Sequence, residues 1–345
     1  MYFRTEKVNL KSSIEVRRVS EFLSQFDLQY DDVDYTIIIK ENNNIIATCS
    51  KKNNIVKCFA IDENYQGQGI AGILITDITN ELFDENIYHS FIFTKPKNKC
   101  IFEGLGYNSI VDTDKVSLME IGNNNIKNYL KKIKKDYDIN DNDEYAALVM
   151  NCNPFTLGHK YLIEMAAKEN ENVLVFVVEE DKSSFSFKDR LNLVKLGVKE
   201  FENVKVIPGG EYIISSATFP SYFLRKNDDV MKEYTKVDAS IFGKYFAKEI
   251  NIVRRYVGTE PYCGVTDTYN ETLQEILPRY GVNIKVVERM SLESGIISAS
   301  KVREFLKYGE LDKVKELVPL TTYEFLIGND GKKVIDLIKS SDKKH

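Results

Sequence analysis

Four short apolar runs in the second half of the chain constrain its fold more than any other feature. They read YAALVM (145–150), NVLVFVV (172–178), INIVRRYVG (250–258) and VNIKVVE (282–288), and helical stretches separate them. Strands that are apolar along their whole length are typical of a parallel sheet with helices on both faces. This half of the chain is therefore predicted to be an α/β domain built on a parallel sheet.

The first 120 residues carry a different pattern. Apolar residues recur at helical spacing over 14–26, and three strand-like runs then follow, joined by the asparagine-rich turns ENNN and KKNN. This order predicts a helix and then an antiparallel meander over YTIIIK, IIATCS and IVKCFAI. A helix (IAGILITDITNELFD) and a strand (HSFIFTK) are expected after the meander. The amino-terminal part is thus predicted to be a mixed α/β domain.

A polar, lysine-rich segment at 121–143 separates the two patterns. Its lysines could form a phosphate patch, but a charge run of this kind is more often a solvated helix. We therefore predict a first domain at 1–128, a linker helix at 129–143 and a second domain at 144–345. A length of 345 residues agrees with two domains.

Composition disfavours several classes of protein. The formal net charge of -5 argues against a nucleic-acid partner. Five scattered cysteines without a CxxC pair predict neither a disulfide framework nor a zinc site, so a reducing, cytoplasmic location is expected. No segment has the pattern of a secretory signal or the length and apolarity of a membrane span, so no membrane partner is expected.

Residues 148–160, LVMNCNPFTLGHK, lead from a predicted strand into the next helix. Ligands of open parallel sheets bind beyond the carboxyl ends of the strands, where this loop lies. Gly158 lets the backbone pass close to a ligand, and the free N–H groups at a helix start bind phosphate. His159 and Lys160 occupy the first turn, where acidic residues are preferred. A bound polyanion would remove this conflict; the alternative is a structural histidine.

The same conflict recurs in GIISASKVREFL, residues 295–306. Ser298 or Ser300 is suited to cap the start of a helix, yet Lys301 and Arg303 lie in its first turn. Local rules tend to be broken at functional sites. The two basic helix tips are therefore predicted to meet at one polyphosphate.

Both segments carry a family resemblance. TLGH resembles the (H/T)xGH signature of the nucleotidylyltransferase superfamily, and ISASKVR resembles its second signature, ISSTxxR, in the same order along the chain. The resemblance implies a Rossmann-like domain that binds ATP with Mg²⁺ and transfers an adenylyl group. It identifies no metal ligand in this sequence.

The resemblance also implies roles for individual residues. His159 would bind the α-phosphate and the charge that develops as pyrophosphate leaves, and Arg303 would neutralise the outer phosphates. The implied catalytic residues are His159, Thr156, Lys160 and Arg303. The implied ATP-binding residues are Asn151, Asn153, Phe155, Gly158, Gly258, Thr259, Glu260, Asp267, Tyr269, Asn270, Ser298 and Ser300. Lys182 and Arg190 are expected near the phosphates or the second substrate.

A glycine-rich loop in the first domain reads IDENYQGQGIAG, residues 61–72. Gln66, Gly69 and Ala71 fit QxxGxA, which resembles the pyrophosphate loop of the GNAT acetyltransferases; IFEGLGYNSI (101–110) resembles a later segment of that family. The implied CoA- or pantetheine-binding residues are Gln66, Gly67, Gln68, Gly69 and Ala71. For a catalytic base, Glu63 and Tyr107 are both candidates, and the alternative is that the domain only binds a pantetheine arm.

Three longer stretches resemble the citrate lyase ligase family: EYIISSATFPSYFL (211–224), DASIFGKYFAKEINIVRRYVGTEP (238–261) and TDTYNETLQEILP (266–278). That resemblance implies an AMP-forming acid–thiol ligase. It would use ATP and acetate, through acetyl adenylate, to acetylate the thiol of a dephospho-CoA-type prosthetic group on the citrate lyase acyl carrier subunit.

Other functions stay open from the sequence. The chain could adenylylate nicotinamide mononucleotide or phosphopantetheine, or it could be a non-catalytic nucleotide sensor. For the acid, Phe155, Phe187 or Phe219 could form an apolar wall, and Lys160 or Arg190 could hold the carboxylate.

Overall fold

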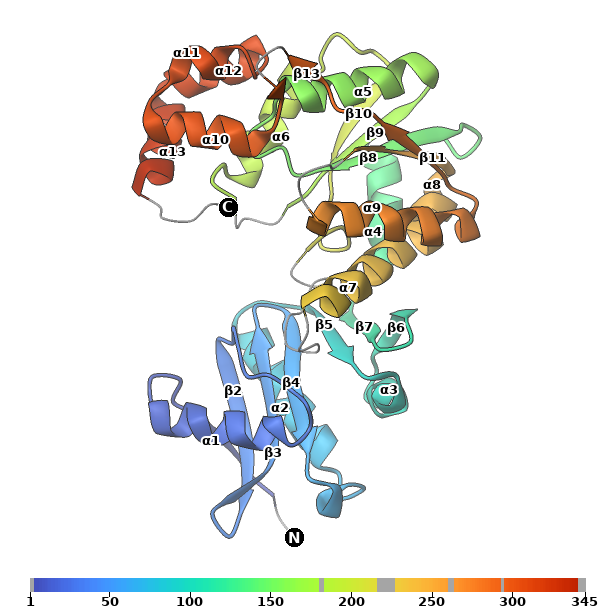
Figure 1. The fold of residues 1–345 in the computed structure, drawn as a ribbon. Coiled ribbons are helices and arrows are strands. Elements are labelled where there is room, and N and C mark those ends of the chain that lie inside the picture. The colour runs from blue at the N-terminus through green and yellow to red at the C-terminus, as the bar shows by residue number, and fades with distance from the viewer. Residues whose placement is uncertain (1–2, 180–182, 216–226, 260–263, 293–294, 341–345) are drawn as a thin grey trace. The chain divides into compact units, whose positions relative to one another are not determined.

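The computed structural model describes residues 3–179, 183–215, 227–259, 264–292 and 295–340. Contacts between Cα atoms divide the chain into two compact units (Figure 1). The first comprises Met1–Tyr129 with Ser216–Val237, and the second comprises Leu130–Ser215 with Asp238–His345. This grouping concerns contacts alone, and the domain limits expected from the sequence stay a prediction.

The first unit is built on a seven-stranded sheet with the order β1-β2-β3-β4-β5-β7-β6. Its strands are β1 (Thr5–Lys7), β2 (Tyr35–Glu41), β3 (Asn44–Lys52), β4 (Ile55–Ile61), β5 (His89–Thr94), β6 (Asn108–Asp112) and β7 (Ser117–Gly122). β2, β3 and β4 form the predicted antiparallel meander. β4 and β5 are parallel but pair only at Ile55–Phe91 and Val56–Ile92, so their carboxyl ends are not paired with each other.

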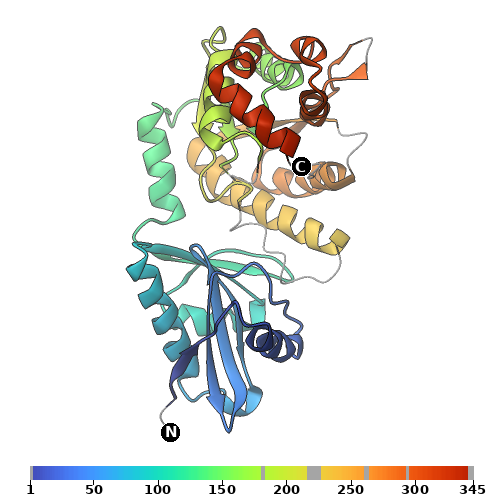
Figure 2. The same ribbon diagram turned by 90° about the vertical axis from the view of Figure 1, so that its left-hand side faces the viewer.

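Helices cover both faces of this sheet (Figure 2). They are α1 (Ser13–Ser24), η1 (Glu63–Tyr65), α2 (Ile70–Asp84), η2 (Pro96–Asn98) and α3 (Lys99–Glu103). Leu23 of α1 belongs to one buried cluster with Ile38, whereas Leu74 of α2 belongs to another with Ile37. Neighbouring residues of a strand point to opposite faces, so α1 and α2 lie on opposite sides of β2. Both helices were predicted from the sequence, and both are confirmed.

The second unit contains a five-stranded sheet in the order β10-β9-β8-β11-β12, and all its pairs are parallel. The strands are β8 (Tyr145–Met150), β9 (Val173–Val177), β10 (Val204–Pro208), β11 (Ile252–Gly258) and β12 (Asn283–Val287). The predicted parallel sheet is confirmed. A separate two-stranded ribbon joins β13 (Ser291–Leu292) to β14 (Gly295–Ile296).

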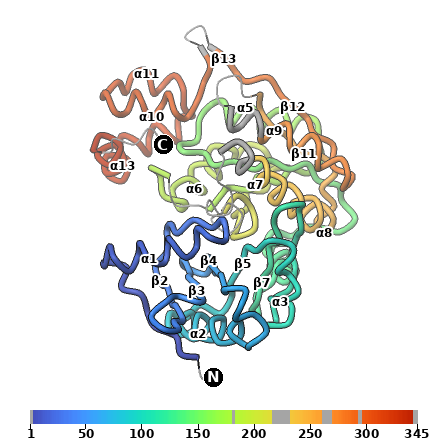
Figure 3. The backbone as a smooth tube through the Cα atoms, turned by 60° about the horizontal axis from the view of Figure 1, so that its bottom comes forward, coloured from blue at the N-terminus to red at the C-terminus, as the bar shows by residue number. Residues whose placement is uncertain are grey.

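Helices lie on both faces of this sheet as well. Val175 of β9 packs in one cluster with residues of α5, α6 and α10, whereas Phe176 contacts the rings of Phe242 and Phe246 on the other face. The four helices α10 to α13 form a group of their own (Figure 3). The helices are α5 (Leu157–Glu169), α6 (Phe187–Gly197), the π-helix η4 (Phe242–Ala247), α8 (Lys248–Ile250), α9 (Gly264–Ile276), η5 (Leu277–Tyr280), α10 (Ala299–Tyr308), α11 (Leu311–Lys315), α12 (Leu320–Ile327) and α13 (Asn329–Ser340). Helix α7 (Asn227–Ile241) groups with the first unit up to Val237 and with the second from Asp238.

The lysine-rich segment forms helix α4 (Ile126–Asp136). Ile126, Leu130 and Ile133 are buried along one side of it, while Lys127 and Lys131 are exposed. This amphipathic pattern is that of a surface helix. Among the residues described, no helix has the length and apolarity needed to cross a membrane.

Candidate functional site

Hydrogen bonds fix the loop after β8 where it leads into α5. The Thr156 side chain caps α5 by accepting from the His159 N–H at 3.3 Å. The carbonyl of Phe155 accepts from the Thr322 hydroxyl at 3.1 Å, and the Leu157 N–H donates to the carbonyl of Leu317 at 2.9 Å. The carboxyl-terminal helices therefore fix the backbone on both sides of Thr156.

These contacts determine the tautomer of His159. Its Nδ1 lies 3.1 Å from the Thr156 backbone nitrogen and 2.9 Å from the Thr156 hydroxyl. A backbone N–H can only donate, so Nδ1 must be the unprotonated acceptor and Nε2 must carry the proton. Burial, and then the positive charge of Arg289, lower the pKa of His159 to about 4. At neutral pH the ring is therefore an uncharged N–H donor directed by Thr156.

The second basic helix tip lies beside the first. A Cβ added to Gly158 would lie 3.3 Å from the carbonyl oxygen of Ile297, just before α10. Ser298 caps α10 by accepting from the Lys301 N–H at 3.2 Å. Arg303 donates from Nη1 to the carbonyl of Asn153 at 2.5 Å and from Nη2 to the Ser300 hydroxyl at 3.3 Å. The two motifs, about 140 residues apart in sequence, are thus joined at the carboxyl end of β8.

Arg289 is a basic residue of this region that the sequence reasoning missed. It follows β12, and its backbone N–H donates to the Thr259 hydroxyl at 3.2 Å. Its charge acts on His159, and its own pKa is lowered by burial. The signal available was its place directly after the carboxyl end of a predicted parallel strand, because such ends share one edge of the sheet.

The end of β11 is fixed by two hydrogen bonds. The Asn270 side chain donates to the carbonyl of Gly258 at 2.9 Å, and the Thr259 N–H donates to the carbonyl of Val287 at 2.9 Å. Tyr269 faces elsewhere, because its hydroxyl donates to Asp238 at 2.6 Å and accepts from Arg255 at 3.1 Å. Glu260, Lys182 and Phe219, and the side chain of Asp267, lie outside the described parts of the structure.

Arg190 requires a correction. It is 0% exposed, and it donates to the carbonyls of Phe185, Asn151 and Val178 at 2.7 to 3.1 Å and to the Asn151 side chain at 2.7 Å. These bonds hold the loops after β8 and β9 together. Arg190 therefore supports the site from within the core and does not face a ligand.

Lys160 and Phe155 also differ from expectation. The ammonium of Lys160 is ion-paired with Glu200 and lies 5.9 Å from the Phe201 ring. Phe155 is 0% exposed, and a Cβ on Gly197 would lie 2.4 Å from its ring. Phe155 is thus a core residue under His159, with the two rings stacked at 6.0 Å, and not an exposed pocket wall.

Three more of the residues named from the sequence lie in the loops around this region: Asn151, Asn153 and Phe187. Asn151 is exposed at the loop surface, where its side chain pairs with Ser183 and Arg190. The Asn153 side chain accepts from the Phe185 N–H at 3.1 Å, which fixes the peptide whose carbonyl binds Arg303. Phe187 is half-buried at the start of α6. Only the Asn153 carbonyl is thereby tied to the second basic helix tip.

A pocket of about 520 Å³ opens in the first unit where the carboxyl ends of β4 and β5 diverge. It is lined by the end of α1, the loop that precedes α2, and the segment after β5. Gln66, Gly67, Gly69 and Ala71 all line it, whereas the Gln68 side chain donates to the carbonyl of Asn64 at 3.3 Å. Gly67 and Gly69 have φ of 77° and 78°, a conformation that favours glycine.

The two candidate bases of this domain differ in position. Glu63 lines the pocket. Tyr107 is buried, its hydroxyl lies 3.4 Å from that of Ser90, and burial raises its pKa. Tyr107 is therefore a core residue, which corrects its place among the candidates.

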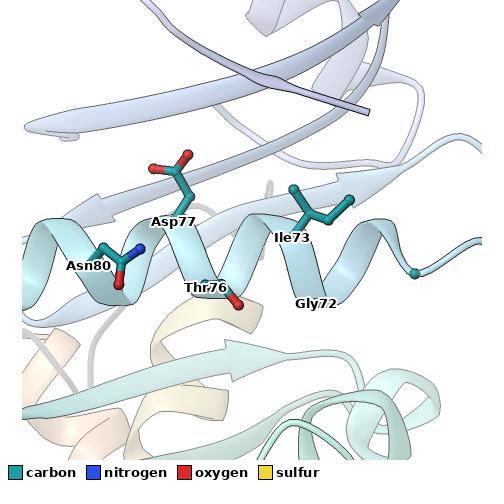
Figure 4. A pocket seen from close by; sticks show the side chains of 6 residues that line it. Gly72, Ile73, Thr76, Asp77 and Asn80 are labelled. Carbon is teal, nitrogen blue, oxygen red and sulfur yellow. The ribbon is translucent and has the colours of Figure 1, made fainter. Parts of the chain in front are cut away.

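A second hollow of about 500 Å³ runs along the outer side of α2 (Figure 4). Its lining comes from one helix: Gly69, Gly72, Ile73, Thr76, Asp77 and Asn80. The carboxylate of Asp77 is already engaged by the hydroxyls of Thr5 and Tyr35. We assign no ligand to this hollow. Within the described ranges, no group of three or more His, Cys, Asp or Glu side chains is placed to hold a metal ion.

Comparison with known proteins supplies the family context. Residues 145–326 match the family model described as the citrate lyase ligase C-terminal domain, and residues 6–99 match that of the acetyltransferase (GNAT) family. The citrate (pro-3S)-lyase ligase of Escherichia coli K12 is 34% identical over 327 residues, which cover 93% of this chain and 92% of that protein. The protein of the same name from Klebsiella pneumoniae is 34% identical over 324 residues, 92% of this chain and 94% of its own length.

These matches confirm the predicted fold class. A GNAT-like α/β domain is followed by a citrate lyase ligase C-terminal domain that is built on a parallel sheet with helices on both faces.

Proposed function

Because the chain belongs to the citrate lyase ligase family, we propose that it is an ATP-dependent ligase that acetylates the acyl carrier subunit of citrate lyase. The observation that best supports an adenylylating step is the hydrogen bond from Arg303 to the carbonyl of Asn153. It brings two basic helix tips to one end of a parallel sheet, and such a place suits a polyphosphate.

The proposed reaction has two steps. A carboxylate oxygen of acetate attacks the α-phosphorus of ATP, a P–O bond forms, and the bond from that phosphorus to the bridging oxygen breaks, so that pyrophosphate leaves. The thiol of the carrier then loses its proton and attacks the acyl carbon, the C–O bond to the phosphate breaks, and AMP leaves. The first step mainly needs positioning and stabilisation of charge on the phosphates.

In the proposed first step, different residues of the site contact different phosphates of ATP. The Nε2–H of His159 donates to the α-phosphate, and Thr156 holds the ring in the tautomer that can do so. Arg303, Ser298 and Ser300 receive the outer phosphates, and Arg289 adds a fourth donor group that the motifs did not suggest. Mg²⁺ enters with ATP as a counter-charge to its phosphates, and we assign it no protein ligand.

The pocket between β4 and β5 is proposed to take the thiol-bearing arm of the carrier. Glycine-rich backbone at the start of α2 suits a diphosphate, and the diverging strands leave room for an extended chain. In this proposal the first domain binds the arm, and acyl transfer by the GNAT-like domain itself is not required.

Exchange of labelled pyrophosphate into ATP tests the first step. We expect the purified full chain to catalyse exchange only when acetate is present, and then to acetylate the carrier thiol with release of AMP. Exchange that depends on nicotinamide mononucleotide or a pantetheine phosphate, and not on acetate, would replace this proposal with a simple adenylyltransferase. Tight ATP binding without exchange under any of these conditions would favour a nucleotide sensor.

A substitution in α2 tests the arm-binding pocket. Ala71 lines the pocket, so Ala71→Phe is expected to fill it and lower the rate of carrier acetylation at least about tenfold, while acetate-dependent exchange is unchanged. Thr76→Phe is the matched control, because Thr76 is exposed on the outer side of the same helix. Should Ala71→Phe acetylate the carrier at the wild-type rate, the arm must bind elsewhere.

A further inference from the structure

The second unit buries two arginines, and their surroundings differ. Arg190 is 0% exposed, and it donates hydrogen bonds to backbone carbonyls and to the Asn151 side chain. Arg255 of β11 is 2% exposed, and its Nη2 donates a hydrogen bond to the Tyr269 hydroxyl at 3.1 Å. Within the described part of the chain, neither its Nε nor its Nη1 has a partner. Buried donors without an acceptor are costly, so these two nitrogens call for an explanation.

Asp238, a buried carboxylate whose charge acts on Arg255, is committed to other donors. Asp238 accepts from the Tyr269 hydroxyl at 2.6 Å and from the Ile214 N–H at 2.9 Å. The charge of Asp238 attracts Arg255, and the Tyr269 hydroxyl bridges the two side chains. No direct ion pair between Asp238 and Arg255 is found among the described residues. The Phe242 ring lies against the guanidinium, with Cζ 4.4 Å from the ring centroid. One planar face is covered in this way, while the edge with Nε and Nη1 still has donors to offer.

The cluster lies near the carboxyl end of β11, on the face of the sheet that Phe242 covers. Ile214 lies in the loop that follows β10, and Arg255 is three residues before Gly258, where β11 ends. The next residue after Tyr269, Asn270, fixes the Gly258 carbonyl. Ile214 is a β-branched residue with φ of 43°, a strained conformation of the kind that persists near functional sites.

We propose that Arg255, supported by Tyr269 and Asp238, holds the carboxylate of the small acid substrate. This inference rests on the proposed function and names the acid's binding group within it. A planar carboxylate matches the guanidinium fork, and it would supply the acceptors that Nε and Nη1 lack. Lys160 and Arg190, the cations first expected for this task, are already engaged by Glu200 and by loop carbonyls.

The surroundings also set the kind of acid. The guanidinium of Arg255 is only 2% exposed, so the space beside it is confined and favours an acid with a short chain. The neighbouring carboxylate of Asp238 disfavours a dianion, so a carboxylate fits better than a second phosphate. Arg255 would thus distinguish the acid from the nucleotide, whose phosphates belong to the two helix tips.

The test compares Arg255→Met, which removes the charge, with Arg255→Lys, which keeps it but loses the fork. In the pyrophosphate exchange assay, we expect Arg255→Met to raise the KM for acetate about 10- to 100-fold and to leave the KM for ATP unchanged. Arg255→Lys should fall between this variant and the wild type. The control is Arg254→Met, because Arg254 binds the Asn170 side chain at 2.7 Å and serves neither substrate here.

Binding of acetate without ATP gives a second readout. Acetate should raise the thermal unfolding temperature of the wild type and of Arg254→Met, but not that of Arg255→Met, whereas ATP should stabilise all three.

The outcomes separate the two proposals. An unchanged KM for acetate in Arg255→Met, or an equal rise for both substrates, would assign Arg255 a structural role with buried water and overturn the inference. If the wild type shows no acetate-dependent exchange, the proposed function fails, and the thermal measurement still decides whether Arg255 binds a carboxylate. Should Arg255→Met not fold, the KM values of Arg255→Lys decide, since this variant keeps the charge.

Discussion

Replacing His159 with alanine should lower acetate-dependent pyrophosphate exchange by about two to four orders of magnitude, with the fold intact. The ring is positioned by Thr156 through Nδ1, so that Nε2–H is its free donor. The loss should appear mainly in kcat, because this donor acts most strongly on the charge that develops as pyrophosphate leaves.

Two variants of His159 separate the role of Nδ1 as an acceptor from the role of Nε2 as a donor. In His159→Asn the side-chain oxygen can replace Nδ1 as the acceptor for Thr156, but no donor stands in place of Nε2. In His159→Gln the amide N–H can approach the Nε2 position. We therefore expect His159→Asn to resemble alanine and His159→Gln to recover part of the rate. Lys168→Ala, on the exposed side of α5, serves as the control and should behave as wild type. Full activity of His159→Asn would exclude the donor role.

The pH dependence gives an independent check on His159. Its pKa is lowered to about 4 in the folded protein, against about 6.5 for an ordinary histidine. The neutral ring is thus retained down to about pH 4, and exchange in the free enzyme should show no histidine limb near pH 6.5. The same shift affects stability. On lowering the pH, His159 becomes protonated at a higher pH in the unfolded chain than in the folded protein, so the free energy of unfolding falls as pH falls from about 6.5 toward 4. A limb near pH 6.5 that His159→Gln abolishes would contradict the lowered pKa of His159.

The strands were predictable from the sequence where apolar residues form most of a run. β8, β9 and β11 are apolar over most of their length, and β2 to β4 are separated by asparagine turns, so periodicity alone locates them. β10 was missed, because VKVIP is an edge strand with a lysine and a proline and buries only part of its length. Edge strands carry the weakest apolar signal, since one side of their backbone has no neighbouring strand.

The sequence led to two helix tips that break a local rule, at His159 and Arg303; the structure brings them together, and their role in a site stays a prediction. Lys160 was not placed correctly, although it adjoins His159 in sequence, because consecutive helix residues point about 100° apart and its ammonium meets Glu200 instead. Arg190 was mistaken for a ligand contact because its partners are backbone carbonyls, which carry no sequence signature. Arg289 was missed because it belongs to no sequence motif and its position depends on where β12 ends.

Replacing Arg303 with methionine should lower exchange by about two to three orders of magnitude and raise the KM for ATP. Arg303 is the side chain that joins the two motifs: it binds the carbonyl of Asn153 with one nitrogen and Ser300 with another, which leaves further donors of the fork for phosphate. Arg303→Lys should recover only part of the loss, because an ammonium supplies a point charge without the bidentate geometry.

The remaining question for Arg303 is whether it acts on the phosphates or only holds the loop. Added guanidinium ion should restore part of the exchange rate of Arg303→Ala if the lost group is a phosphate donor, because a free guanidinium can occupy the vacated space. If Arg303 only fixes the Asn153 carbonyl, the loop will shift and the ring of His159 will lose the geometry set by Thr156. The ¹⁵N shifts of the His159 ring, readable in a chain with three histidines, would then change in Arg303→Met, and guanidinium would restore nothing. Unchanged ring shifts together with chemical rescue would place Arg303 among the residues that touch ATP, and would show that the link to Asn153 orients the fork.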